Sequence, residues 1–457
     1  MKKTSVLNVA GLTSRLVGEH TPFLKKWRQE GKSVSIQPPL PAVTCTSQST
    51  FLTGTMPNTH GIVGNGWYFR EECEVKFWRQ SNKLVDSKKI WESAKEKNPE
   101  FTCANLFWWY NMYSTVDYSV TPRPQYAADG RKFPDIYTQP ASLRDTLQKK
   151  LGTFPLFDFW GPKTSIRSSR WIAEAAKVVE ELYHPSLTLI YLPHLDYNLQ
   201  RFGNDFPEIG KDLREIDSVC EDLITFYESR NTQVLVISEY GITNVSHPVA
   251  LNRIFRENGL IAVREERGME LLDAGASKAF ALADHQIAHV YINDKSELNR
   301  VRKILENTKG VGLILGEDEK PKFQLNHHRS GELIAVADKD SWFAYYYWLN
   351  DNKAPDFART VDIHRKPGYD PVELFANPDL SFLALRAGMK LLKKQLGFRM
   401  LMDIIPLKPE LVKGSHGRLP DDDKDAPMLI SSEKSCVPDG KIDGAEVFNI
   451  LLTHLQL

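Results

Sequence analysis

Four short apolar segments constrain the fold of this chain more than any other feature. They are SVLNVAGL from residue 5, FTCANLFWWY from residue 101, LTLIYLP from residue 187 and QVLVISEYG from residue 233. Helical patterns separate them, such as residues 168–183, where apolar side chains recur with the period of an amphipathic helix. Continuous apolar strands that alternate with helices predict a mostly parallel central sheet with helices on both faces. We therefore expect an α/β fold.

Polar residues lie in or directly after three of these segments. Asn8 lies in the first, His194 and Asp196 follow the third, and Glu239 and Tyr240 follow the fourth. In parallel sheets, ligands bind beyond the carboxyl ends of the strands. We therefore expect these side chains to converge at that edge of the sheet.

Residues 38–65 contain the strongest candidate for a reactive group. The segment PPLPAVTCTSQSTFLTGTMPNTHGIVGN reads as an extended Pro-rich entry, a Thr, and a short helix that ends at Gly54. Thr44 then lies at a helix start, where free backbone N–H groups and the helix dipole hold a phosphate and favour an alkoxide. Thr44 is thus a candidate nucleophile. The alternative is that Thr44 or Thr46 only caps the helix.

This segment resembles the nucleophile segment of the nucleotide pyrophosphatase/phosphodiesterase branch of the alkaline phosphatase superfamily. The family pattern is Pro-x-x-Thr, a helix that closes on Thr-Gly, then Pro-x-x-His-Gly-Ile and Asn. The matching residues are Pro41, Thr44, Thr53, Gly54, Pro57, His60, Gly61, Ile62 and Asn65. One position departs, because Ser47 stands where the family has an Asn that holds a substrate oxygen. The resemblance implies that Thr44 is catalytic and leaves open whether the shorter Ser47 replaces that Asn.

The resemblance also implies the architecture. We expect residues 1–457 to form a single alkaline-phosphatase-like domain, with insertion or cap segments at approximately 66–165 and 290–410. The first of these is rich in Trp, Tyr, Pro and Gly without a clear period, and it supplies either lids and binding loops or peripheral packing. The second begins with a helix and a strand, continues with an aromatic strand around residue 342, and predicts a smaller α+β lobe.

The family binds two metal ions, and the first metal position is partly present in this sequence. The family pattern for it is Asp-x-x-x-His with a late His-Gly. Asp196 matches the Asp, Gln200 stands where the His is expected, and the late pair is His416-Gly417. The resemblance implies that Asp196, Gln200 and His416 lie within reach of one ion.

The second metal position is more strongly altered. The family uses an Asp that ends the first strand, the nucleophile and an Asp-His pair. Here the first-strand Asp is Ala10, with Asn8 two residues earlier on the same strand face, and the pair is Glu239-Tyr240. An oxygen-rich set of this kind suits Mg²⁺ or Mn²⁺ better than Zn²⁺. We expect one or two divalent ions, and the alternative is that the second position is empty.

Two acid–imidazole pairs offer replacements for the lost ligands. They are Asp284-His285 and Asp362 with His364, both in turn-rich segments. His364 precedes Lys366-Pro367-Gly368, a loop of the kind that reaches into a site, and it is a candidate base for Thr44. The alternative for each imidazole is a structural role in which it bonds to backbone groups.

Composition limits the partners. Lys plus Arg equals Asp plus Glu at 58 each, so no global field would attract a nucleic-acid polymer or an anionic membrane. No apolar run approaches the ~18 residues that span a bilayer. The five cysteines are scattered without CxxC spacing, which favours a cytoplasmic protein over a disulfide-bonded one. The oligomeric state is left open.

These features predict a metal-assisted hydrolase of phosphate diesters, pyrophosphates or phosphonates of a small metabolite or nucleotide, acting through Thr44. The competing hypothesis is a catalytically impaired pseudoenzyme that binds a phosphorylated metabolite or a partner. The altered ligand positions favour the second hypothesis, and the intact nucleophile segment favours the first.

Overall fold

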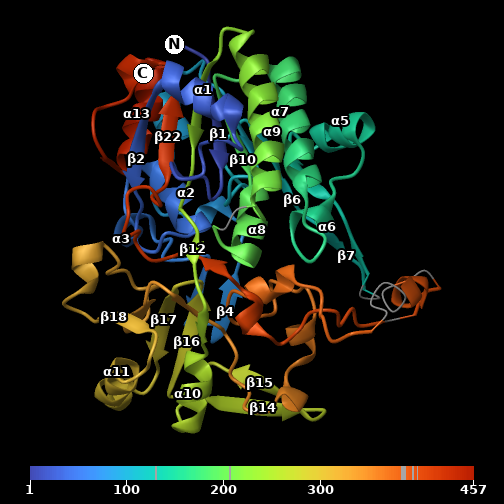
Figure 1. Ribbon diagram of the computed structural model, residues 1–457, viewed down its shortest axis with the longest axis vertical. Helices are drawn as coiled ribbons and strands as arrows, with labels where there is room; N and C mark the ends of the chain where they lie inside the picture. Colours follow the sequence, from blue (N-terminus) through green and yellow to red (C-terminus); the bar gives the residue numbers. More distant parts are fainter. Residues whose placement is uncertain (129–130, 205–206, 382–387, 394–395, 399) are drawn as a thin grey trace.

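The computed structural model describes residues 1–457 except 129–130, 205–206, 382–387, 394–395 and 399. Its upper part in Figure 1 is built on a nine-stranded sheet, and a smaller lobe lies below it. The strand order in the large sheet is β23 (Ile442–Asp443), β2 (Lys32–Gln37), β22 (Met428–Ser431), β11 (Gln233–Ile237), β1 (Thr4–Val9), β10 (Leu187–Leu192), β5 (Cys103–Leu106), β6 (Tyr118–Pro122) and β9 (Ile136–Gln139).

The central strands of this sheet are parallel. β1 pairs with β10 and β11, with Asn8 opposite Tyr191 and Ile237, and the parallel order continues through β5 to β6. β22 and β9 run antiparallel to their neighbours on the two flanks. The predicted α/β fold with its mostly parallel centre is confirmed. The carboxyl ends of β1, β10 and β11 consequently meet at one edge.

Helices cover both faces of the sheet. One group comprises α1 (Pro22–Glu30), α7 (Ile166–Tyr183) and α9 (Gly210–Glu228), and α7 and α9 pack on β10 and β11. A second group comprises α2 (Thr44–Thr53), α4 (Ile90–Lys97) and α13 (Glu446–Leu455), in which α13 contacts both of the others. The short helices α3 (Pro57–His60), α5 (Ser142–Leu151), α6 (Leu156–Phe159) and α8 (His194–Phe202) complete this part. A continuous apolar core joins the sheet to its helices.

The smaller lobe has its own antiparallel sheet and its own core. The sheet order is β16 (Ala279–Asp284), β17 (Ile287–Ile292), β19 (Leu333–Ala337) and β18 (Val311–Leu315). The hairpin β14 (Ala262–Glu266) to β15 (Met269–Asp273) and the helices α10 (Leu251–Glu257) and α11 (Leu298–Glu306) accompany it. This sheet begins before residue 290, and the division of the chain into one domain with two insertions stays a prediction.

Short two-stranded pairings connect the remaining segments. They are β3 (Gly66–Phe69) with β4 (Glu74–Phe77), β7 (Gln125–Tyr126) with β8 (Lys132–Phe133), β12 (Thr243–Asn244) with β21 (Gly414–Ser415), and β13 (His247–Val249) with β20 (Ser341–Phe343). The aromatic strand expected around residue 342 is therefore limited to three residues. The Tyr345–Trp348 run beyond it is buried in the core of the smaller lobe, where the packing of large rings replaces ladder hydrogen bonds.

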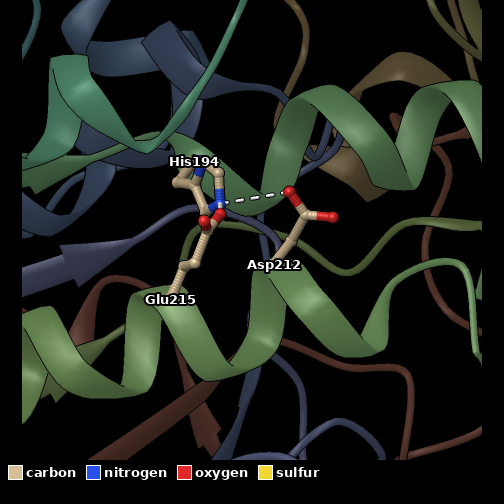
Figure 2. A group of neighbouring side chains, drawn as sticks. All are labelled: His194, Asp212 and Glu215. Atoms are coloured by element: carbon tan, nitrogen blue, oxygen red, sulfur yellow. Dashed lines mark ion pairs between the residues drawn. The ribbon is translucent and has the colours of Figure 1, made fainter.

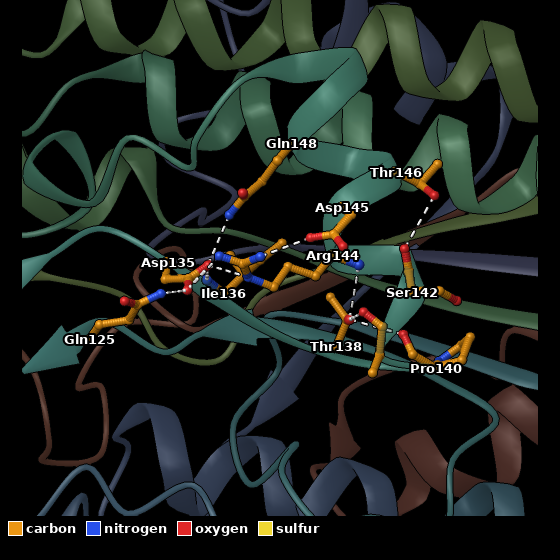
Figure 3. A network of polar contacts seen from close by, with 11 residues as sticks. Gln125, Asp135, Ile136, Thr138, Pro140, Ser142, Arg144, Asp145, Thr146 and Gln148 are labelled. Atoms are coloured by element: carbon orange, nitrogen blue, oxygen red, sulfur yellow. Dashed lines mark hydrogen bonds and ion pairs between the residues drawn. The ribbon is translucent and has the colours of Figure 1, made fainter.

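The antiparallel edge of the large sheet is held by one carboxylate (Figure 3). Asp135 precedes β9, and its oxygens accept a bidentate pair from Arg144 on α5 at 2.7 and 2.9 Å. Gln148 on the same helix, Gln125 on β7 and the N–H of Ile136 donate to the same group. Bidentate charge-assisted bonds of this type fix geometry as well as energy. They attach α5 to the end of the sheet.

A buried ion triad holds the loop at residues 366–373. The ammonium of Lys366 lies 2.7 Å from both Asp370 and Glu373, and all three side chains are at most 2% exposed. Glu373 also accepts a hydrogen bond from the Trp160 indole at 2.6 Å. The triad fixes the conformation of the loop that carries Tyr369 to the carboxyl edge of the large sheet.

None of the helices in the described part of the chain combines the length and the apolarity that crossing a membrane requires.

We predict that Lys366→Met destabilises the protein by about 3–5 kcal/mol, because it leaves two buried carboxylates without a cation. The matched control is Lys353→Met, since Lys353 pairs with Glu265 at 2.9 Å but both side chains are about half exposed. The control should cost about 1 kcal/mol or less. Urea unfolding of the three proteins measures this, and equal losses for both variants would contradict the prediction.

Candidate functional site

Thr44 is the first residue of α2. Val43 occupies the N-cap position in an extended conformation, without a side-chain cap, and Gly54 ends the helix with φ 64°. Thr44 is therefore not the cap of the helix, and its hydroxyl is free for other contacts. The N–H of Cys45 donates to Asn65 at 3.0 Å, and Asn65 in turn donates twice to Asp284. This chain of bonds ties the start of the helix to the smaller lobe.

The Thr44 hydroxyl lies in a hydrogen-bonded row with Tyr240 and Asp196. Its Oγ1 is 3.3 Å from the Tyr240 Oη, and this phenol donates to Asp196 Oδ1 at 3.1 Å. Because the phenol has one proton and gives it to Asp196, Thr44 is the donor in the first contact. The row therefore leads a proton away from Thr44 and leaves the lone pairs of its oxygen available.

Asp196 also lies beside the residues predicted for the first metal position. Gln200, one turn further along α8, donates to Asp196 Oδ2 at 2.8 Å and accepts from the Tyr369 hydroxyl at 3.0 Å. The His416 Nε2 is 3.9 Å from Asp196 Oδ1. The His416 Nδ1 lies 2.8 Å from the Ala42 carbonyl and must carry the proton, so the Nε2 lone pair faces Asp196.

Four rings stack beside this carboxylate. The Tyr240 ring lies on His416 at a centroid distance of 3.6 Å and an interplanar angle of 2°. The ring centroid of His285 lies 3.7 Å from that of His416, and the ring centroid of Tyr369 lies 3.7 Å from that of His285. The stack brings together four segments that are far apart in the sequence. It also holds the Tyr240 hydroxyl between Thr44 and Asp196.

Glu239 is surrounded by amides. Its Oε1 accepts from Asn8 at 2.5 Å and from Gln48 on α2. The carbonyl oxygen of Gln48 accepts the backbone N–H of Trp109 at 2.6 Å, which fixes the direction of the amide. The Glu239 Oε2 and the Asn8 Oδ1 are buried and have no hydrogen-bond partner among the described residues.

Burial dominates the electrostatics of the site. It raises the pKa of Asp196 to about 7 against the donated bonds of Tyr240 and Gln200, and it raises the pKa of Glu239 to about 8 against those of Gln48 and Asn8. Burial likewise lowers the pKa of His416 to about 3. His416 is consequently neutral near pH 7, and both carboxyl groups titrate near neutrality.

The residues at the first metal position fit one divalent ion. Asp196 and His416 present an oxygen and a nitrogen lone pair 3.9 Å apart, within twice a metal–ligand distance of ~2.0–2.2 Å, so one ion can reach both after a small approach of the two side chains. The bond from His416 to the Ala42 carbonyl is the type of contact that orients a ligating imidazole. That these residues bind a metal stays a prediction.

The residues at the second metal position do not fit an ion in the same way. Ala10 offers no ligand atom, and Tyr240 presents a neutral phenol that is already committed to Asp196. Amide protons from Asn8 and Gln48 already occupy the Glu239 Oε1. This arrangement supports the alternative stated from the sequence, in which the second position is empty.

Two of the predicted catalytic residues are not joined to Thr44 by any contact in the described part of the chain. Ser47 is fully buried on α2, and its hydroxyl has no hydrogen-bond partner among the described residues. His364 is exposed, and its Nδ1 is 3.4 Å from the Phe77 carbonyl. The loop that carries His364 does reach the site, but through Tyr369. The roles of Ser47 and His364 stay predictions.

Sequence reasoning missed Gln48 and Tyr369. Gln48 lies one helical turn after Thr44, so its placement beside the nucleophile was readable from the α2 pattern. Tyr369 reaches Gln200 only because the buried Lys366 triad folds its loop. His285, one of the alternative imidazoles, does lie in the site.

The chain is similar in sequence to one large family. The profile of the type I phosphodiesterase / nucleotide pyrophosphatase family matches residues 4–370. A Schizosaccharomyces pombe protein named as an uncharacterized pyrophosphatase/phosphodiesterase is 24% identical over 246 residues, 52% of this chain and 41% of that protein. Ectonucleotide pyrophosphatase/phosphodiesterase 2 of Saccharomyces cerevisiae is 23% identical over 288 residues, 57% of this chain and 52% of that protein. The chain spans about half the length of these curated relatives.

Solved structures share the fold. Murine ectonucleotide pyrophosphatase / phosphodiesterase 5, as an inactive variant in complex with AMP, has a TM-score of 0.60 at 14% identity and covers 100% of this chain and 96% of its own. Phosphonoacetate hydrolase from Sinorhizobium meliloti, in complex with phosphonoformate, has a TM-score of 0.62 at 12% identity and covers 99% and 96%. At these identities the likeness establishes the fold and not the chemistry.

We predict that Glu239→Gln removes part of the pH dependence of stability in metal-free protein. The folded-state pKa of Glu239 is raised. Its contribution to the free energy of unfolding is therefore favourable below about pH 4.5 and is lost as the pH rises toward about 8. The loss approaches ~1.4 kcal/mol per pH unit in that window. The Gln side chain is shaped like the protonated acid and has no such loss.

Denaturant unfolding at pH 5 and pH 8 with a chelator measures the difference. The matched control is Glu221→Gln, an exposed position on α9, which should follow the wild type at both pH values. Equal pH slopes for the wild type and Glu239→Gln would refute the assignment.

Proposed function

This chain belongs to the type I phosphodiesterase / nucleotide pyrophosphatase family, and from that premise we propose that it hydrolyses phosphate diesters, pyrophosphates or phosphonates through Thr44. The observation that carries the proposal is the row from Thr44 through Tyr240 to Asp196 at the carboxyl edge of the sheet. A hydroxyl at a helix start with a defined path for its proton has the two features that a nucleophile requires.

In the proposed reaction the Thr44 oxygen attacks phosphorus, the bond from phosphorus to the leaving oxygen breaks, and the leaving alkoxide or phosphate takes any proton it needs from solvent. The Thr44 proton passes to Tyr240, and in the metal-free site Asp196 accepts the Tyr240 proton, because burial raises the pKa of Asp196 to about 7 there. A cation on Asp196 would lower that pKa and oppose this last transfer. The N-terminus of α2 faces the transferred group with its backbone N–H donors and the positive end of its dipole. Water then hydrolyses the phosphorylated Thr44.

Asp196 and His416 would hold one divalent ion in this proposal, with Gln200 beside them. When bound, such an ion supplies Lewis-acid stabilisation of the negative charge on the phosphoryl oxygens. Because Tyr240 and Glu239 replace the ligands of the second position, Thr44 is less strongly activated than in a site with two ions. We therefore expect slow turnover that Mn²⁺ or Mg²⁺ supports.

The proposed substrate is a small phosphorylated metabolite or nucleotide. In support, the murine neighbour is solved with AMP and the rhizobial neighbour with a phosphonate. The balanced charge of the chain gives no reason to expect a polymer. We propose a cytoplasmic location from the five cysteines, which are all free, although the budding-yeast relative is named an ectonucleotide enzyme.

The second candidate function is the pseudoenzyme. Its support is specific, because Asn8 and Gln48 donate hydrogen bonds to one oxygen of Glu239 beside the positions that lost metal ligands. Such a site would bind a phosphorylated metabolite without turning it over. A wild-type protein that binds AMP but cleaves no phosphodiester, pyrophosphate or phosphonate with Mn²⁺ or Mg²⁺ would establish this alternative.

We predict that Thr44→Ala lowers the turnover of an aryl phosphodiester such as bis(4-nitrophenyl) phosphate on the order of 10³-fold or more. Thr44→Ser keeps a hydroxyl and should retain part of the activity. Thr46→Ala is the matched control, since Thr46 is buried on the same helix and its hydroxyl has no partner among the described residues. Unchanged turnover in Thr44→Ala would end the proposal.

We predict that Tyr240→Phe keeps the ring stack on His416 but lowers turnover about 10²-fold, because it interrupts the proton path to Asp196. The pH–rate profile should differ from that of the wild type, because Thr44 loses its link to Asp196. Tyr345→Phe is the control, because Tyr345 is fully buried and its hydroxyl has no partner in the described part of the chain. A Tyr240→Phe enzyme with the wild-type profile would show that the row does not carry the proton.

A further inference from the structure

A second cluster of ligand-type side chains lies on the other side of α8 (Figure 2). His194 begins α8, and Asp212 and Glu215 lie one turn apart near the start of α9. His194 points across to α9, where the two carboxylates point back at its ring. One atom from each of the three residues lies within 4.8 Å of the others.

The distances match those of ligands that share an ion. The His194 Nε2 is 3.1 Å from Asp212 Oδ1 and 3.3 Å from Glu215 Oε2. A nitrogen and an oxygen that each lie ~2.0–2.2 Å from one ion are separated by roughly 3.0–3.5 Å at tetrahedral or octahedral angles. The two distances from the imidazole nitrogen therefore already suit a shared ion.

Ordinary hydrogen bonding does not account for the imidazole. His194 is 2% exposed, its Nδ1 has no hydrogen-bond partner among the described residues, and its Nε2 has only the ion-pair contacts with the two carboxylates. A protonated imidazole in a simple ion pair would point an N–H at one of the two carboxylates. Here the Nε2 lies at nearly equal distances, 3.1 and 3.3 Å, from one oxygen of each carboxylate.

The carboxylate of Asp212 is held in place from behind. The Asn198 amide nitrogen is 2.9 Å from both of its oxygens, and the Asn198 carbonyl accepts from Arg201 at 2.7 Å. Such bonds orient metal ligands and tune their affinity. The Glu215 side chain is 25% exposed, so an ion reaches the cluster from solvent.

We propose that His194, Asp212 and Glu215 form a binding site for a divalent transition ion, Zn²⁺ or Mn²⁺, separate from the Thr44 site. An imidazole with two carboxylates suits these ions better than Ca²⁺ or Mg²⁺. Three protein ligands leave further positions to water. The cluster lies on the face of α8 opposite Asp196 and Gln200, since residues two apart on a helix point in opposed directions. A bound ion joins α8 to α9 and so fixes the helix that carries Asp196.

The test uses a full-length variant in which the predicted metal ligands of the Thr44 site are removed. Asp196→Asn with His416→Gln is the background, and circular dichroism and gel filtration verify its fold. Co²⁺ titration with visible absorption, together with elemental analysis, reports coordination and stoichiometry. The background should bind one Co²⁺ per chain with ligand-field bands of a nitrogen–oxygen site, and Zn²⁺ should displace it and raise the melting temperature.

Variants in that background assign the ligands. Glu215→Gln should weaken Co²⁺ binding by at least about 100-fold, and Asn198→Ala by about 10–100-fold, as expected for the loss of an orienting contact. Glu221→Gln, an exposed acid on the same helix, should bind as the background does. A background without bound Co²⁺, or binding that Glu215→Gln leaves unchanged, overturns the proposal. If the background does not fold, the stoichiometry of the wild type against Glu215→Gln decides, with a loss of one ion expected.

Discussion

The burial of two carboxylates at the carboxyl edge of the large sheet is the constraint on which the site depends. Asp196 and Glu239 are removed from water, and a buried charge without compensation is costly. In this chain the compensation comes from side-chain donors: Tyr240 and Gln200 for Asp196, and amides for Glu239. The residues that replace the family's metal ligands are thus donors to the carboxylates that remain.

The replacement of metal ligands by hydrogen-bond donors explains why the altered residues are compatible with one another. An imidazole replaced by Tyr240 loses a metal ligand but gains a phenol proton for Asp196, and its ring stacks on His416. Gln200 likewise donates to Asp196 and receives a bond from Tyr369. The outcome is a site in which Asp196 and His416 keep the side-chain types predicted for one metal position, while hydrogen bonds from amides engage Glu239 at the other.

Helix α8 connects the Thr44 site to α9 and to the loop of the buried Lys366 triad. One of its faces carries Asp196 and Gln200 into the Thr44 site, and the other places His194 and Asn198 against α9. The rotation of this helix is therefore set on both sides. The loop of the buried Lys366 triad restrains the same helix from a third direction, since Tyr369 bonds to Gln200.

The sequence by itself determined the parallel sheet, the helix start at Thr44 and the family, and it predicted the residues at the altered metal positions. These follow from local periodicity and from motifs whose spacing is short, so they need no long-range information. The tertiary structure alone decided that Gln48 engages Glu239, that Tyr369 and His285 complete the ring stack, and that His194 faces Asp212. These contacts join residues from separate elements, and their existence depends on helix rotation and loop packing, which no local pattern encodes.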